Sequence, residues 1–259
     1  MILFQKKTVL FLCIFLFHYI GTAKTYRSFK EAFNANPSDV IKLVIRNKNI
    51  DSIPFQITKL VNLKKLYLYS NNLVTIPSFI SELKNLEILI ISKNPLTIIP
   101  KEIGDFPKLK KLSLRYNQLT EIPGEIGNLT FLDELRLDHN ELTILPVALS
   151  NLENLTYLNI SENNLKNIPD DFCNLSLLQY FILNENRLIN LPENLGLLHD
   201  LIELDLYQAG ANLRIPSSIS NCRKLEILHV DQTIIVPYSI LQGNPRLKII
   251  QTPSTVRGI

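Results

Sequence analysis

A 23-residue periodicity constrains this chain more than any other feature of its sequence. Leucines recur at that interval from Leu63 to Leu201, Val40 lies one interval earlier, and prolines keep the same period. The asparagines in phase with them are Asn71, Asn94, Asn117, Asn140, Asn163 and Asn186. Three columns in one phase over residues 40–200 indicate seven copies of one structural unit, each stacked on the next.

Each unit contains a short segment that alternates apolar and polar residues. Leu112 and Leu114 are apolar, and Lys111, Ser113 and Arg115 are polar, which is the period of a strand with one buried face. One such strand cannot bury its apolar face alone, so stacked units are expected to form a parallel sheet over a shared core. The asparagine that follows can satisfy backbone groups of neighbouring buried turns, and the proline fixes φ where the chain turns away.

The consensus of the units, LxxLxLxxNxLxxIPxxIxxLxx, resembles the leucine-rich repeat pattern of the 23-residue class over about residues 40–250. Together with a leader and a short YxxFxxAF segment, it resembles secreted bacterial leucine-rich repeat proteins of spirochaete type. The resemblance implies an α/β repeat solenoid, a horseshoe whose concave face is a parallel sheet of about ten strands. Short helical or 3₁₀ turns would form its convex side.

The two ends of the repeat array depart from the consensus. Residues 24–39 are expected to form an N-terminal helical cap, because Ser28 and Glu31 have capping-box spacing and Phe29 begins an apolar helical face. Residues 201–259 are interpreted as degenerate repeats and a C-terminal strand, with no amphipathic helix at that end. That strand is either an open edge, through which copies could form a homo-oligomer, or is covered by a loop.

Residues 1–23 have the composition of a secretory signal peptide. Lys6 and Lys7 precede an apolar run at residues 8–20, and small residues up to Ala23 favour cleavage there. The alternative is an uncleaved anchor. Export to a secreted, extracytoplasmic or cell-surface location is therefore expected, with no membrane span in the mature chain. Without its leader the chain has 25 basic and 24 acidic residues, which gives no indication of a nucleic-acid partner.

The sequence contains no motif for an enzyme or for a cofactor. The chain has only 8 glycines and none of the usual phosphate-loop, nucleophile-elbow or zinc motifs. Cys173 and Cys222 lie about two repeats apart, too far for a disulfide, and are interpreted as packed or free thiols. Asp205, His229 and Asp231 are the one combination that could hold a metal ion, and a solvated polar patch is the alternative interpretation.

The outward strand positions are the expected binding surface, since solenoids bind with the sheet face. Basic residues dominate the first half of this face and acidic residues the second half, which would orient a charged partner. Aromatic, apolar and arginine side chains that are typical of binding hot spots occupy both halves. The predicted partner-binding residues are Tyr67, Tyr69, Ile88, Ile90, Arg115, Tyr116, Arg136, Asp138, Tyr157, Tyr180 and Ile182.

These observations favour a non-catalytic, secreted or surface-exposed recognition module that binds a host or envelope protein on its concave face. A glycan-binding module is one alternative, because rows of tyrosine can stack on sugar rings. A self-assembling envelope or structural protein is the other.

Overall fold

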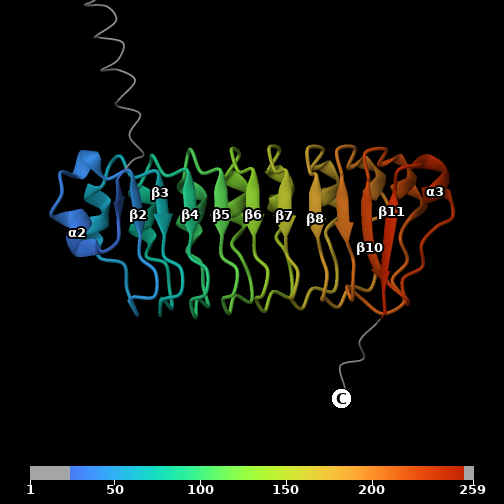
Figure 1. The fold of residues 1–259 in the computed structure, drawn as a ribbon, viewed down its shortest axis with the longest axis horizontal. Coiled ribbons are helices and arrows are strands. Elements are labelled where there is room, and N and C mark those ends of the chain that lie inside the picture. The colour runs from blue at the N-terminus through green and yellow to red at the C-terminus, as the bar shows by residue number, and fades with distance from the viewer. Residues whose placement is uncertain (1–23, 254–259) are drawn as a thin grey trace, which may run out of the picture.

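The computed structural model describes residues 24–253, so the predicted leader at residues 1–23 lies outside the described residues. Eleven strands lie side by side in chain order and form one parallel sheet (Figure 1). Figure 1 shows that the first and last strands of this sheet lie at opposite ends of the molecule, so the sheet is open. The predicted α/β repeat solenoid is confirmed, with an uncurled sheet in place of a horseshoe. Within the described residues, no helix is long and apolar enough to cross a membrane.

Most strands are three residues long and begin at the third position of a unit. The last residue of each of these strands pairs with the residue 23 positions later, as Tyr67 does with Ile90. The strands are β1 (Thr25–Tyr26), β2 (Lys42–Val44), β3 (Lys65–Tyr67), β4 (Ile88–Ile90), β5 (Lys111–Ser113), β6 (Glu134–Arg136), β7 (Tyr157–Asn159), β8 (Tyr180–Ile182), β9 (Glu203–Asp205), β10 (Ile227–Asp231) and β11 (Lys248–Thr252).

The side opposite the strands consists of 3₁₀ turns, and most of these begin directly after a proline of the repeat. A proline with φ near −65° is already in the conformation that such a turn needs at its start; Pro54, for example, has φ −65°. The turns are η1 (Pro37–Asp39), η2 (Phe55–Lys59), η3 (Ser78–Glu82), η4 (Lys101–Asp105), η5 (Gly124–Asn128), η6 (Val147–Asn151), η7 (Asp170–Asn174), η8 (Leu195–Leu197) and η9 (Ser217–Asn221).

The two ends differ from the sequence-based expectation. The front segment contains helix α2 (Phe29–Phe33), whose Ala32 is fully buried, but it also adds β1 to the sheet. Ser28 caps α2 by accepting a hydrogen bond from the Glu31 amide, whereas the Glu31 carboxylate accepts one from Arg27 instead of closing the box on Ser28. At the rear, where the sequence predicts no amphipathic helix, a short helix, α3 (Ser239–Gly243), buries Ile240.

One continuous apolar core runs the length of the solenoid between the sheet and the turns. Each unit contributes its strand leucines and the apolar residues of its turn, as in Leu112, Leu114, Leu119 and Ile126, none of which is more than 1% exposed. Because each unit shares this core with the next, burial of apolar area is the main favourable contribution to stacking.

The six asparagines of the repeat form a buried ladder between neighbouring units. Asn140 Nδ2 donates to the carbonyl oxygens of Leu137 at 2.8 Å and of Leu114, in the preceding unit, at 3.0 Å. Its Oδ1 accepts from the Leu119 amide at 3.1 Å, also in the preceding unit. The ladder ends at Ala209, beyond which the Asp231 carboxylate accepts a hydrogen bond from the Gln208 amide at 2.9 Å.

Neighbouring units are in close contact on both sides of the solenoid. Backbone hydrogen bonds join successive turns after the strands at 2.8 Å, as from Gln118 to Leu96. On the opposite side, an added Cβ on Gly104 or Gly127 would lie 2.1–2.2 Å from a carbonyl oxygen of the next turn, so these turns are already in contact.

We expect Asn140→Asp to reduce the free energy of unfolding by about 3 kcal/mol or more, because a buried carboxylate would face carbonyl oxygens that now accept hydrogen bonds. Gln118→Glu is the matched control, since it makes the same change on an exposed side chain and should change stability by less than about 0.5 kcal/mol. Urea unfolding followed by circular dichroism measures both. Equal effects of the two substitutions would contradict the role given to the ladder.

Candidate functional site

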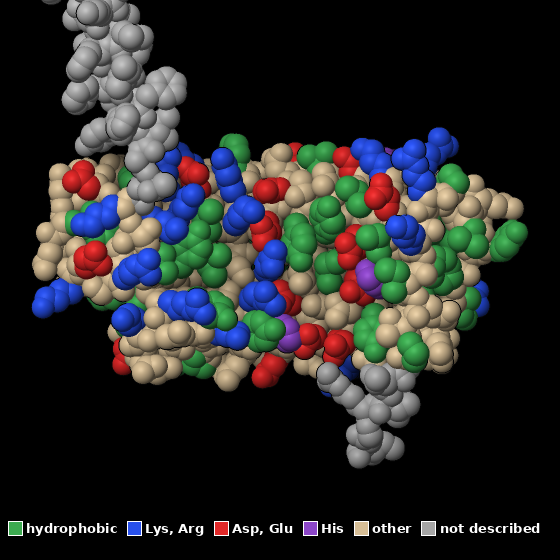
Figure 2. All heavy atoms as spheres, in the orientation of Figure 1, with side chains coloured by type: hydrophobic (Ala, Val, Ile, Leu, Met, Phe, Trp, Pro, Cys, Tyr) green, Lys and Arg blue, Asp and Glu red, His purple; other side chains and the backbone are tan. Residues whose placement is uncertain are grey.

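The outward side chains of β2–β10, with that of the second residue after each three-residue strand, form a continuous surface that we call the strand face. The alternation of each strand places its middle leucine or phenylalanine in the core and its flanking residues outside. Figure 2 shows this face, with lysine and arginine side chains gathered over the first strands and more acidic side chains beyond the middle.

The front cluster consists of the predicted residues Tyr67, Tyr69, Ile88, Ile90 and Tyr116. Lys65 and Tyr67 on β3 pair directly with Ile88 and Ile90 on β4. Both isoleucines are partly buried by their neighbours on the sheet and are not fully exposed as the sequence predicts, whereas Tyr116 is 37% exposed. The structure therefore brings the predicted front residues together on adjacent strands.

The rear cluster consists of Tyr157 on β7 and of Tyr180 and Ile182 on β8. The rings of Tyr157 and Tyr180 lie 5.9 Å apart and are tilted by 37°. All three side chains are partly buried and face the same side as the front cluster. The strand face thus has two apolar patches, separated by the polar residues of β5 and β6.

A row of charged and aromatic side chains lies along the margin of the strand face that follows the ends of the strands. Lys93 Nζ lies 5.6 Å from the ring centroid of Tyr69 and 5.1 Å from that of Tyr116, and Tyr116 stacks on His139 at 3.8 Å. His139 Nδ1 is 2.7 Å from a Glu162 oxygen. Lys93 beside the Tyr69 hydroxyl lowers the pKa of that tyrosine. Such cation–π contacts fix the rings in place before any partner arrives.

The sequence analysis missed this row as a unit. Lys93, Tyr116, His139 and Glu162 each directly precede a ladder asparagine, and each has φ between 51° and 55°. Only glycine adopts this left-handed region without strain. The signal that could have identified the row is this column of non-glycine residues at one fixed position before the asparagine.

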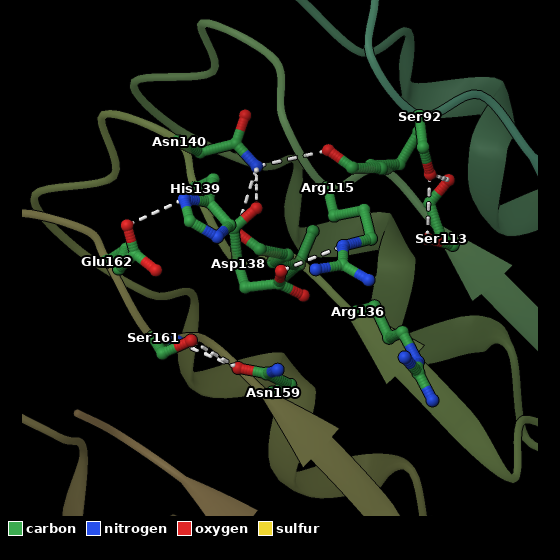
Figure 3. A network of polar contacts seen from close by, with 12 residues as sticks. Ser92, Ser113, Arg115, Arg136, Asp138, His139, Asn140, Asn159, Ser161 and Glu162 are labelled. Atoms are coloured by element: carbon green, nitrogen blue, oxygen red, sulfur yellow. Dashed lines mark hydrogen bonds and ion pairs between the residues drawn. The ribbon is translucent and has the colours of Figure 1, made fainter. Parts of the chain in front are cut away.

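The middle of the strand face contains an ion pair whose carboxylate is buried. Arg115 Nε lies 2.9 Å from Asp138 Oδ2, and the Asp138 side chain is only 2% exposed (Figure 3). Burial raises the pKa of the Asp138 carboxyl, and Arg115 offsets this only in part. Asp138 is therefore not exposed to a partner as its place among the predicted partner-binding residues requires, because its side chain is buried against Arg115.

Glu134 and Arg136 on β6 also interact with each other. Arg136 Nε donates to Glu134 at 2.6 Å, and Lys111 Nζ donates to the other Glu134 oxygen at 2.6 Å. Burial alone would raise the pKa of Glu134, but these two hydrogen bonds hold it below its ordinary value. Arg136 lies 4.8 Å from the ring centroid of Tyr157, so it connects this pair to the rear cluster.

The three residues considered for a metal site are not arranged as one. Both oxygens of the buried Asp231 accept hydrogen bonds, from Gln208 and Thr233, and Asp205 accepts one from the Tyr207 amide. His229 Nε2 lies 3.4 Å from Glu203. Among residues 24–253, no group of three or more histidine, cysteine, aspartate or glutamate side chains could hold a metal ion.

Both cysteines of the described chain are buried and free. Burial raises the pKa of the Cys173 thiol to about 11 and that of Cys222 to about 12. Because the thiolate is the nucleophilic form, neither side chain has the environment of a reactive cysteine at neutral pH.

Comparisons with known proteins agree with this architecture. A model described as "Leucine-rich repeat region" matches residues 97–179, and one described as "Leucine Rich Repeat" matches residues 62–83 and 85–106. A search of curated proteins finds no match.

Solved structures with the same fold come from bacteria and plants. A leucine-rich repeat protein of Leptospira interrogans is 25% identical, with 89% of this chain and 82% of that chain covered and a TM-score of 0.59. An internalin (inlF) of Listeria monocytogenes is 25% identical, with 85% and 64% covered and a TM-score of 0.73. The plant peptide hormone receptor RGFR1, in complex with RGF2, is 25% identical, with 90% and 46% covered and a TM-score of 0.62. The chain thus spans less than two thirds of the internalin and less than half of the receptor.

We expect Arg115→Ala to destabilise the fold by about 3 kcal/mol, since it removes one partner of a buried ion pair. Without Arg115 the pKa of Asp138 in the folded state should rise further, while that of the unfolded state stays near 3.8. A raised carboxyl pKa costs stability once the group ionises, so the loss should be larger at pH 7 than near pH 4.

Denaturant unfolding of Arg115→Ala at these two pH values measures the effect. Adding Asp138→Asn should restore most of the stability and remove the pH dependence, because no charge is then left buried. A loss that is the same at both pH values would show that the Asp138 carboxylate is not its cause.

Proposed function

The chain is a leucine-rich repeat protein, and we propose that it acts as a non-catalytic recognition module that binds a protein partner on the strand face. The observation that most supports this proposal is the front cluster: Tyr67 and Ile90 lie side by side on an outward sheet surface, where neither is needed to fill the core. Tyrosine is among the residues that dominate binding energy at protein interfaces.

The arrangement of the charges around the front cluster also favours binding. Lys42 lies 5.5 Å from the Tyr67 ring centroid, and Arg46 lies 5.1 Å from that of Tyr69. These contacts hold long side chains in place, which lowers the entropy that binding would otherwise cost. Basic residues at the margin of an apolar patch would steer an acidic partner surface toward it.

The comparisons support a protein ligand over a glycan. The plant receptor of this fold is described in complex with RGF2, and internalins share the fold over most of this chain. A host or envelope protein remains the partner that we propose for this chain. A glycan ligand is less well supported, because the chain has no tryptophan and its front cluster contains two isoleucines.

The binding proposal is tested by capture of proteins from serum, extracellular matrix and envelope extracts on the immobilised protein. Tyr67→Ala/Ile90→Asp should lose a genuine partner by at least about 2 kcal/mol of binding energy, as expected for hot-spot residues. Ile144→Asp is the matched control, because Ile144 is 64% exposed and lies outside the strands. Partners retained equally by both variants would contradict the assignment of the front cluster.

The proposal includes export, with residues 1–23 as a signal peptide, residues 24–39 as the cap, residues 40–200 as the regular repeats and residues 201–259 as the degenerate end. Its basis is the run of apolar residues behind Lys6 and Lys7 and the small residues up to Ala23. We expect the mature protein recovered outside the cytoplasm to begin at Lys24, as measured by N-terminal sequencing. Recovery with Met1 intact would contradict cleavage.

A further inference from the structure

The two halves of the strand face differ in the charges they leave available. In the front half, Lys42, Arg46 and Lys65 form no ion pair with any carboxylate among the described residues. In the rear half, Glu203 and Asp205 lie on the same face of β9, and His229 Nε2 lies 3.4 Å from a Glu203 oxygen. Figure 2 shows the same change of sign along the face.

The residues of the two halves are also placed symmetrically about β6, the middle strand of the eleven. Ile88 and Ile90 on β4 lie two strands before β6, and Tyr180 and Ile182 on β8 lie two strands after it. Lys65 on β3 and Glu203 on β9 lie three strands from β6 on either side, at the same position of the repeat. A second copy of the face, turned by 180° about a line along β6, would therefore place apolar side chains against apolar ones and acidic side chains against basic ones.

We propose that the strand face binds a second copy of this chain, related to the first by a two-fold axis that runs parallel to the strands over β6. Rotation about that axis places β4 of one copy opposite β8 of the other, so that apolar side chains meet apolar side chains. It also places Lys65 opposite Glu203, and Tyr67 opposite Asp205. Each of these contacts occurs twice, as a two-fold interface requires.

The middle of this interface brings no net charge to the axis. Glu134 and Arg136 on β6 each lie opposite their own counterpart in the second copy, but within each copy they already pair with each other at 2.6 Å. On the next strands, Lys111 of one copy lies opposite Tyr157 of the other, a pair that can form a cation–π contact.

The size and shape of the strand face fit such an interface. The nine strands β2–β10, about 4.8 Å apart, and outward residues spread over about 14 Å of strand give an area of about 600 Å² per copy. Two copies would then bury about 1,200 Å² in total, which is at the lower end of the range for a specific interface. The open sheet allows two copies to lie against each other over its length.

This inference rests on the proposed use of the strand face for protein binding, and it names one partner for that face. A foreign partner would then have to displace the second copy, and an acidic and apolar surface like that of β8–β9 would be suited to do so. Among residues 24–253, β11 pairs with β10 alone. Its other edge is a different site, and self-association through it would not depend on the charges of β3 and β9.

Sedimentation velocity of the purified protein at several concentrations tests the inference. We expect a monomer–dimer equilibrium that shifts toward monomer at high salt. Lys65→Glu and Glu203→Lys should each raise the dimer dissociation constant by at least about tenfold, because each places like charges opposite each other twice. An equimolar mixture of the two variants should recover dimer, since every reversed charge then meets an opposite one.

Ile90→Asp should also prevent the dimer, whereas Ile144→Asp should not. A wild-type protein that stays monomeric at all concentrations, or a mixture of the charge variants that recovers no dimer, would overturn the inference. Dimerisation that neither Lys65→Glu nor Glu203→Lys weakens would overturn it too and would point to the β11 edge. If Ile90→Asp still loses a foreign partner in these cases, the proposed function stands and only the self-association is wrong.

Discussion

The buried asparagine ladder is the interaction on which the rest of this structure depends. At the end of each strand the chain turns inside the solenoid, where water cannot reach its amides and carbonyls. A side chain with two donors and an acceptor, at a position 5–9% exposed, satisfies groups of its own unit and of the preceding one. The hydrogen bonds hold neighbouring units in one register, and that register aligns every outward residue with its counterpart on the next strand.

The alignment creates the surface that we propose for binding. The residue at position three of each unit lies beside the residue at position three of the next unit along the whole sheet. A gradient of charge along the sequence therefore becomes a gradient of charge along the surface. The same alignment puts each left-handed residue before the ladder beside its counterpart, so that Lys93, Tyr116, His139 and Glu162 touch in a row. The strain of the left-handed conformation, of order 1 kcal/mol for each such residue, recurs along the array where the ladder holds the turn.

The two ends and the 3₁₀ layer decide the outline of the molecule. Ala209 interrupts the ladder, and the Asp231 carboxylate then accepts from backbone and hydroxyl groups of the last turns. α2 and β1 cover the front of the core, and α3 takes the place of a 3₁₀ turn at the rear. The eleven strands lie in chain order in one open sheet, so its outward face is continuous from β2 to β10.

By itself the sequence determined the repeat, the strands, the residues that face inward and the ladder, because a period of 23 residues repeated over seven units admits one register. Tertiary structure alone decided what depends on distances between units: that Asp138 is buried against Arg115, that Ile88 and Ile90 are only partly exposed, and that residues 25–26 join the sheet. It also decided that the array stays open. The reason is physical: alternation tells which side of a strand a residue faces, but burial and ion pairing depend on the neighbouring side chains, which lie 23 residues away along the chain.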